Sequence, residues 1–164
     1  KIAKKKLGNR GKYYCKDFFQ IRFKKNFFDC VLSLHTIYHI DKNLQLNAVK
    51  KLLSVSKKNS PIIIVYSNPN TILSRIKRIF TNKKKIKNNL YFFCHPISWW
   101  NKFEKNAQIS IKPWRSFSSD HQKIIFPNNF LGKKLLELLF ILENIFENFF
   151  INNFQYYVVI LKKK

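Results

Sequence analysis

The sequence predicts an α/β fold built on a largely parallel sheet, and three consecutive segments carry this prediction. Residues 28–34 form a nearly continuous apolar run, as expected of a strand covered on both faces. Residues 42–57 follow a plausible N-cap, Asp41, and carry an apolar stripe with helical spacing. Residues 61–66 form a second apolar run that Pro61 opens. Strand, helix and strand at this length predict a right-handed βαβ unit.

The remaining segments extend this unit in both directions. A short strand is expected at 12–16, and residues 71–80 have the pattern of a short amphipathic helix. The aromatic cluster at 91–100 leads into a helical turn near 99–105. Further along, the sequence predicts a strand at 109–114, a long helix packed on the sheet at 130–151 and a last strand at 156–161.

Composition is that of a single globular domain. Of the 164 residues, 46% are hydrophobic and 16% are aromatic, which is ample for a core. The three cysteines, Cys15, Cys30 and Cys94, are widely spaced and form no C-x-x-C pair, so reduced thiols and a cytoplasmic location are expected. No apolar run approaches the roughly 20 residues that span a bilayer, because glutamates interrupt the most apolar region.

The net charge of +24 has two interpretations. One is a polyanionic partner, bound through phosphate neutralisation. The other is drift in an A/T-rich genome, because Lys, Asn, Ile and Phe, which all have A/T-rich codons, make up 82 of the 164 residues. Only 5 of the 32 basic residues are Arg, whose planar guanidinium is preferred for phosphate recognition. We favour drift.

Several short motifs resemble class I S-adenosylmethionine-dependent methyltransferases of the broad type-11 kind. Phe28-Asp29 opens the first apolar strand, and the stretch that follows it ends in His39-Ile40. A later pattern reads Phe93-Cys94-His95-Pro96, then Trp99-Trp100, then Trp114-Arg115-Ser116. The resemblance covers residues 12–163.

The resemblance implies a Rossmann-like sheet in the order 3-2-1-4-5-7-6, with strand 7 antiparallel. Strands 3 to 7 then match residues 13–16, 28–34, 61–66, 108–114 and 155–161. Strands 1 and 2 have no counterpart, and with glycines only at 8, 11 and 132 there is no glycine-rich cofactor turn. We interpret residues 1–164 as a partial methyltransferase domain, with cofactor-side strands at 12–70, an acceptor-side insertion with strand 6 at 71–127 and a helix with strand 7 at 128–164. Alone, it is expected to be inactive.

The cofactor that the resemblance implies is S-adenosyl-L-methionine. Asp17 matches the position that accepts a hydrogen bond from the adenine amino group, and Phe18 matches the position that packs on the adenine ring. The alternative is that Asp17 is a solvated turn aspartate. Ser33, Leu34 and His35 match the end of strand 4, which lines the methionine part of the cofactor and the transferred methyl. Open α/β sheets bind ligands at such carboxyl ends.

His35 and His39 are the candidate catalytic residues. A histidine near an acceptor hydroxyl could act as a general base, because its pKa lies near the operating pH. The alternative is that either ring anchors its loop through hydrogen bonds. Their i, i+4 spacing also suits a metal, but the glutamate of the H-E-x-x-H motif is missing and no third ligand is evident, so no metal is expected.

The acceptor side of the cleft is expected to include residues after strand 5 and in the aromatic cluster. These candidates are Ser67, Asn68, His95, Trp99, Trp100 and Arg115. The alternative for the aromatic members is core packing, which large aromatic side chains dominate.

The function that these residues favour is methyl transfer to a small-molecule, sugar or lipid acceptor by the intact protein. An alternative from another class is a basic module that binds RNA or an anionic membrane through Arg75, Lys77, Arg78 and 83–87. A methyltransferase with RNA as its acceptor would combine the two.

Overall fold

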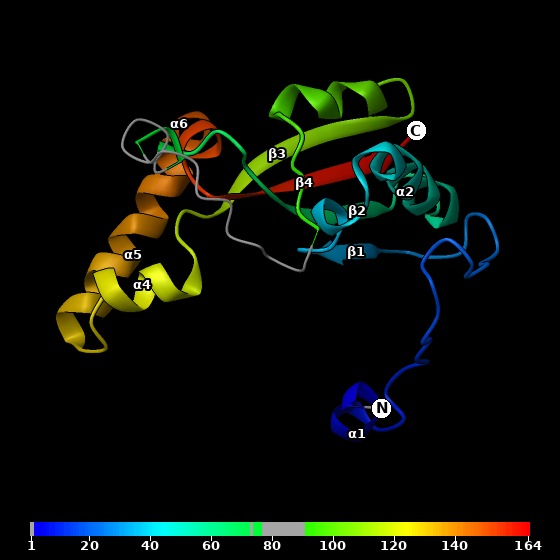
Figure 1. Cartoon of the computed structure of the whole chain (residues 1–164), viewed down its shortest axis with the longest axis horizontal. Helices are drawn as coiled ribbons and strands as arrows, with labels where there is room; N and C mark the ends of the chain where they lie inside the picture. The colour runs from blue at the N-terminus through cyan, green and yellow to red at the C-terminus, as the bar shows by residue number, and fades with distance from the viewer. Residues whose placement is uncertain (1, 73, 77–90) are drawn as a thin grey trace.

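A four-stranded sheet forms the centre of the molecule in a computed structural model that describes residues 2–72, 74–76 and 91–164 (Figure 1). Its strands are β1 (Val31–Leu34), β2 (Pro61–Ser67), β3 (Ala107–Arg115) and β4 (Tyr156–Lys163), in the order β1-β2-β4-β3. β1 and β2 are parallel, whereas β4 is antiparallel to both of its neighbours, β2 and β3. This confirms the expected arrangement of strands 4, 5, 7 and 6, with strand 7 antiparallel.

Helices connect and cover these strands. α2 (Lys42–Val55) links β1 to β2 and begins at Asp41, whose side chain accepts a hydrogen bond from the backbone N–H of Asn43. The 3-10 helices η1 (Ile37–His39) and η2 (Ile97–Phe103) lie before α2 and β3. The other helices are α1 (Ile2–Leu7), α4 (Ser119–Ile125), α5 (Phe130–Ile145) and α6 (Glu147–Asn153). β1, α2 and β2 therefore form the expected βαβ unit.

The hydrophobic core lies on one face of the sheet. Alternate residues of β2 and β4 point to this face, and they pack with the apolar sides of α2 and η2. On the opposite face, Leu32 and Leu34 of β1 remain 60% and 53% exposed. The expectation that residues 28–34 are covered on both faces is therefore wrong for the described residues, because β1 is an edge strand with one packed face.

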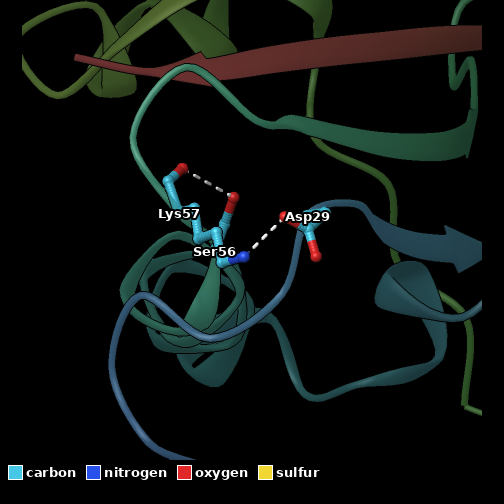
Figure 2. Close-up of polar contacts among 3 residues, drawn as sticks. All are labelled: Asp29, Ser56 and Lys57. Carbon is cyan, nitrogen blue, oxygen red and sulfur yellow. Dashed lines mark hydrogen bonds and ion pairs between the residues drawn. The ribbon is translucent and has the colours of Figure 1, made fainter.

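The amino end of β1 is tied to the turn after α2. Phe28 bridges to Ser56, and the Asp29 carboxylate accepts from Lys57 Nζ at 2.6 Å (Figure 2). The hydrogen bond and charge of Lys57 lower the pKa of Asp29 below its ordinary value. Asp29 is solvent-exposed and lies at the strand's start, so its role here is to hold the turn rather than to take part in chemistry.

Two predicted elements differ in the structure. No strand forms at 12–16, since these residues are exposed and form no sheet ladder with the described strands. The predicted helix at 130–151 is two helices, because Phe146 leaves the helical conformation (φ −111°, ψ 45°). α5 then extends away from the sheet beside α4, whereas α6 packs on β3 (Figure 1). The predicted helix at 71–80 lies partly outside the described residues.

Candidate functional site

The carboxyl edge of the sheet brings together residues that are far apart in sequence. β1 and β2 end there, and β4 begins there because it is antiparallel. His35 follows β1 directly and has a left-handed backbone, with φ of +55°. Such a conformation is uncommon for a residue with a side chain, and it recurs at functional sites where the surrounding fold enforces it. Here the His35 N–H donates to the Val65 carbonyl at 3.3 Å, which ties the turn to β2.

The His35 ring contacts two tyrosines. Its Nδ1 lies 2.9 Å from Tyr38 Oη, and its ring centre lies 4.8 Å from that of Tyr156, edge to face. Burial lowers the pKa of His35, and electrostatic interactions with Arg115 and His39 lower it further. The imidazole is therefore neutral at pH 7, the form that accepts a proton.

His39 has a different environment. Its Nδ1 lies 2.9 Å from the backbone carbonyl of Tyr91, so the ring joins η1 to the segment before η2. Tyr91 Oη in turn accepts from the Lys42 N–H at 3.0 Å, at the start of α2. These contacts correspond to the loop-anchoring alternative for His39, whereas His35 is the histidine held against the edge of the sheet.

Arg115 ends β3 on the same edge. Its guanidinium carbon lies 5.5 Å from the centre of the Tyr156 ring, and Nη1 donates to Ser119 Oγ at 3.1 Å. Tyr156 therefore has the His35 ring on one side and the Arg115 guanidinium nearby. Burial raises the pKa of Tyr156, so its hydroxyl stays protonated.

A cavity of about 330 Å³ lies next to this group. Gln155 is in its wall, and its Nε2 donates to Tyr156 Oη at 3.0 Å. Ser67 and Asn68, both predicted for the acceptor side, also line it. Asn68 is held in place because its Nδ2 donates to the Ile151 carbonyl at 3.0 Å. The other lining residues, which the sequence did not single out as site residues, are Thr71, Ile72, Ser74, Ser116, Phe117, His121, Asn153 and Phe154.

The aromatic candidates are packed in the core. Trp99 and Trp100 are buried, and Trp100 Nε1 donates to Tyr157 Oη at 3.1 Å. The His95 ring stacks on Trp99, with ring centres 4.4 Å apart. Burial lowers the pKa of His95. The placement of these three residues corresponds to the core-packing alternative rather than to the lining of an acceptor cavity.

A buried hydrogen-bond network fixes the loop that carries His95. Tyr66 Oη donates to Gln45 Oε1 at 2.7 Å and accepts from the His95 N–H at 3.0 Å. Gln45 Nε2 donates to the carbonyls of Ile40 and Phe93. Cys94, between these residues, has its thiol pKa raised to about 12 by burial, so it is not a reactive thiolate. This loop therefore supports the site without supplying a nucleophile.

The cofactor-side candidates fall into two groups. Ser33, Leu34 and His35 lie at the carboxyl end of β1. Asp17 and Phe18 lie instead beside the second half of α2, where Lys51 Nζ donates to the Phe18 carbonyl at 2.7 Å. The Asp17 carboxylate accepts from the Phe19 N–H at 2.7 Å, as in a turn. α2 runs from the carboxyl edge to the amino edge of the sheet, so the two groups are not brought together.

Within the ranges 2–72, 74–76 and 91–164, no cluster of three or more His, Cys, Asp or Glu side chains could hold a metal ion. In the part of the chain that the structure describes, none of the helices has the length and apolar character needed to cross a membrane.

Comparison with known proteins shows which proteins this chain resembles. Residues 1–64 match a family model described as a methyltransferase domain. A comparison with curated proteins found no significant match. Among solved structures, the chain resembles a SAM-dependent methyltransferase from Archaeoglobus fulgidus, with a TM-score of 0.51 at 17% identity over 86% of this chain and 61% of that one.

A candidate methyltransferase from Bacillus halodurans C-125 is similar, with a TM-score of 0.53 at 15% identity over 94% of this chain and 77% of that one. The fold is that of a class I methyltransferase domain. The [4+2]-cyclase SpnF is also similar, with a TM-score of 0.54 at 12% identity over 99% of this chain and 60% of that one. The fold alone therefore does not determine the reaction.

Proposed function

We propose that the protein transfers a methyl group from S-adenosylmethionine to a small-molecule acceptor bound at the carboxyl edge of the sheet. The proposal rests on the conformation and contacts of His35. This residue has a left-handed backbone at the end of β1, a neutral ring, a hydrogen-bond partner in Tyr38 and an aromatic neighbour in Tyr156. The match of residues 1–64 to the methyltransferase domain supports this choice of reaction.

The described residues fit the cofactor in part. The carboxyl end of β1 offers the backbone of 33–35 and the side chains of Ser33 and His35, where the methionine part of the cofactor is proposed to lie. When bound, S-adenosylmethionine supplies an electrophilic methyl on a sulfonium. The chain spans 61% of the Archaeoglobus fulgidus structure it matches, so binding and activity are proposed for the protein that its complete gene encodes.

In the proposed mechanism, the chain's residues position the acceptor and accept its proton. Ser67, Asn68 and Gln155 offer hydroxyl and amide groups that orient an acceptor in the cavity. With His35 Nδ1–H donating to Tyr38 Oη, the ring's lone pair is on Nε2. The mechanism requires this tautomer, in which the Tyr38 oxygen accepts from Nδ1–H; burial raises the pKa of Tyr38, so its own proton stays on the phenol. His35 Nε2 would take the proton that the acceptor oxygen or nitrogen loses when a bound S-adenosylmethionine methylates it.

The test is transfer of a labelled methyl group to a panel of small hydroxyl and amine acceptors. His35→Gln keeps a polar side chain but removes the base, so it is expected to lower kcat by about 10²-fold or more. His39→Gln is the matched control, because its ring bonds the Tyr91 carbonyl; it is expected to lower stability and leave kcat within a few-fold. Equal kcat losses in the two variants would reject His35 as the base.

The net charge of +24 favours a second candidate, binding to RNA or an anionic membrane. Its basic segment extends from Arg75 to Lys87, of which 77–90 lie outside the described residues. Neutralising the basic residues in 75–87 would abolish polyanion binding with a steep salt dependence if this candidate is right. Methyl transfer that survives the same substitutions would favour the first candidate.

A further inference from the structure

Arg115 has an incompletely satisfied guanidinium at the carboxyl edge of the sheet. Nη1 donates to Ser119 Oγ, whereas Nε is buried and has no hydrogen-bond partner among the described residues. A buried N–H without a partner costs free energy, and in native structures such a group usually has a functional role or a bound ion or water. Its position beside Tyr156 and His35 makes a functional role the simplest explanation.

No carboxylate of the chain neutralises Arg115. All eight acidic residues lie in the described ranges, and their three ion pairs use Lys57, Lys112 and Lys134. Even the nearby buried carboxylate has other partners, because Glu143 accepts from the N–H and the hydroxyl of Ser116. A partly buried guanidinium without an acid partner in the chain is available to pair with an external anion.

The expected anion carries one negative charge. Gln155 connects the cavity wall to Arg115. Its side chain donates to Tyr156 Oη, and the Arg115 guanidinium lies against the Tyr156 ring. The described lining of this cavity contains neutral polar and apolar side chains together with His121, but neither Lys nor Arg. One guanidinium with no second cation suits a carboxylate better than a phosphate dianion, and its planar edge matches the two carboxylate oxygens.

We propose that Arg115 binds a carboxylate group of the acceptor, so that the acceptor is a small carboxylic acid with its methylated atom near His35. This inference rests on the proposed methyl transfer. Tyr156 would act as a positioning residue, because its ring holds both the guanidinium and the imidazole. Substrate specificity would then be set by one residue, at the end of β3.

The test follows the Nε–H signals of the five arginines of this sequence by NMR, in the ¹⁵N-labelled protein, during titration with benzoate, benzamide or inorganic phosphate at constant ionic strength. Benzoate is expected to shift the Arg115 signal saturably, and benzamide is expected to leave it in place. Arg115→Gln is expected to weaken benzoate binding about tenfold or more, measured by saturation-transfer NMR. Lys112→Gln removes an equal charge from an exposed position of the same strand and should leave binding unchanged.

Other results overturn the inference. These are equal shifts with benzamide, a response of all five signals together, saturation by phosphate without a response to benzoate, or unchanged benzoate affinity in folded Arg115→Gln. If that variant does not fold, Arg115→Lys replaces it. Lysine keeps the positive charge but lacks the planar pair of N–H donors that match a carboxylate. Benzoate binding should therefore weaken several-fold, and unchanged binding would count against the inference.

Failure of the proposed function gives a different result. The titration contains no S-adenosylmethionine, so benzoate binding at Arg115 combined with no methyl transfer to any acceptor would reject methyl transfer but retain the anion site. Transfer to neutral acceptors alone, with no benzoate binding, would retain methyl transfer and reject the carboxylate site.

Discussion

Three local properties support the proposed role of His35 as a general base: a left-handed backbone tied to β2, a neutral ring and a hydrogen bond to Tyr38. Its pKa lies below the ordinary value because burial and electrostatic interactions with Arg115 and His39 disfavour the imidazolium. Since the base must be neutral, activity is present at neutral pH and is lost as the pH falls through this lowered pKa. We therefore expect the reaction rate to fall on the acid side of its pH profile.

We expect kcat/KM to rise with pH and level off, with its midpoint below the ordinary histidine pKa of about 6.5. Removing the positive charge in Arg115→Gln should raise the His35 pKa, so the midpoint should move to higher pH. The measurement is kcat/KM for a neutral acceptor between pH 5 and 8. A midpoint that stays in place in Arg115→Gln would mean that His35 is not the titrating group.

Tyr66 illustrates how a buried hydroxyl stabilises the loop behind the site. In Tyr66→Phe, Gln45 Oε1 loses its donor and the His95 N–H loses its acceptor. The free energy of unfolding should fall by about 1–3 kcal/mol. Denaturant unfolding measures this, with Tyr14→Phe at an exposed position expected to change stability by less than about 0.5 kcal/mol. Similar losses in the two variants would reject a specific role for the network.

Candidate site residues could be predicted from the sequence where they lie at the end of a strand. His35 and Asn68 directly follow apolar strands and Ser67 ends one, so their place at the carboxyl edge follows from the parallel βαβ unit. Tyr38 and Tyr156 were not predicted. Tyr38 lies three residues after His35, and only the 3-10 turn of η1 brings its hydroxyl to the ring. Tyr156 reaches this edge because β4 is antiparallel, a property of the whole sheet.

At the scale of elements, patterns of apolar residues predicted β2, β3, β4 and α2, because each has a buried face with a regular period. The same patterns missed the division between α5 and α6, since the apolar residues continue through Phe146. They also missed α4, which has no buried residue and so no periodic apolar face. Helix caps and sharp turns depend on single hydrogen bonds, such as Asn129 Oδ1 with the Gly132 N–H.

Gly132 determines how α5 approaches the turn after α4. A Cβ at this position would lie 1.8 Å from the Pro127 carbonyl oxygen. Alanine favours helices over glycine by about 1 kcal/mol, but backbone atoms cannot easily give way here. We therefore expect Gly132→Ala to lower the free energy of unfolding by about 1–3 kcal/mol in denaturant titrations.

Gly11→Ala is the control for this prediction, because a Cβ there meets only the Tyr13 ring at ordinary contact distances. It should leave stability nearly unchanged. If Gly132→Ala proved as stable as Gly11→Ala, the close packing of α5 on the Pro127 turn would not be a constraint on the fold.

Over the whole molecule, the large positive charge and the exposed apolar surface act in opposite directions. A net charge of +24 keeps molecules apart at low ionic strength, and salt screens that repulsion. Apolar residues are exposed both on α5, including Phe130, Leu131 and Ile145, and on β1. Of these two elements, β1 also presents unpaired backbone groups, because in the described sheet it is an edge strand that pairs with β2 alone.

Self-association of the 164-residue chain is therefore expected to use the β1 edge and to increase with salt. Leu32→Lys places a charge on this edge at an exposed position, so it should reduce the associated fraction several-fold at 0.5 M salt in sedimentation velocity experiments. Gln108→Lys adds the same charge at an exposed position of β3, the opposite edge, and controls for net charge. If both variants reduced association equally, repulsion between whole molecules would explain the effect. If neither did, the associating surface would be one of the other groups of exposed apolar side chains, on α5 or within residues 13–27.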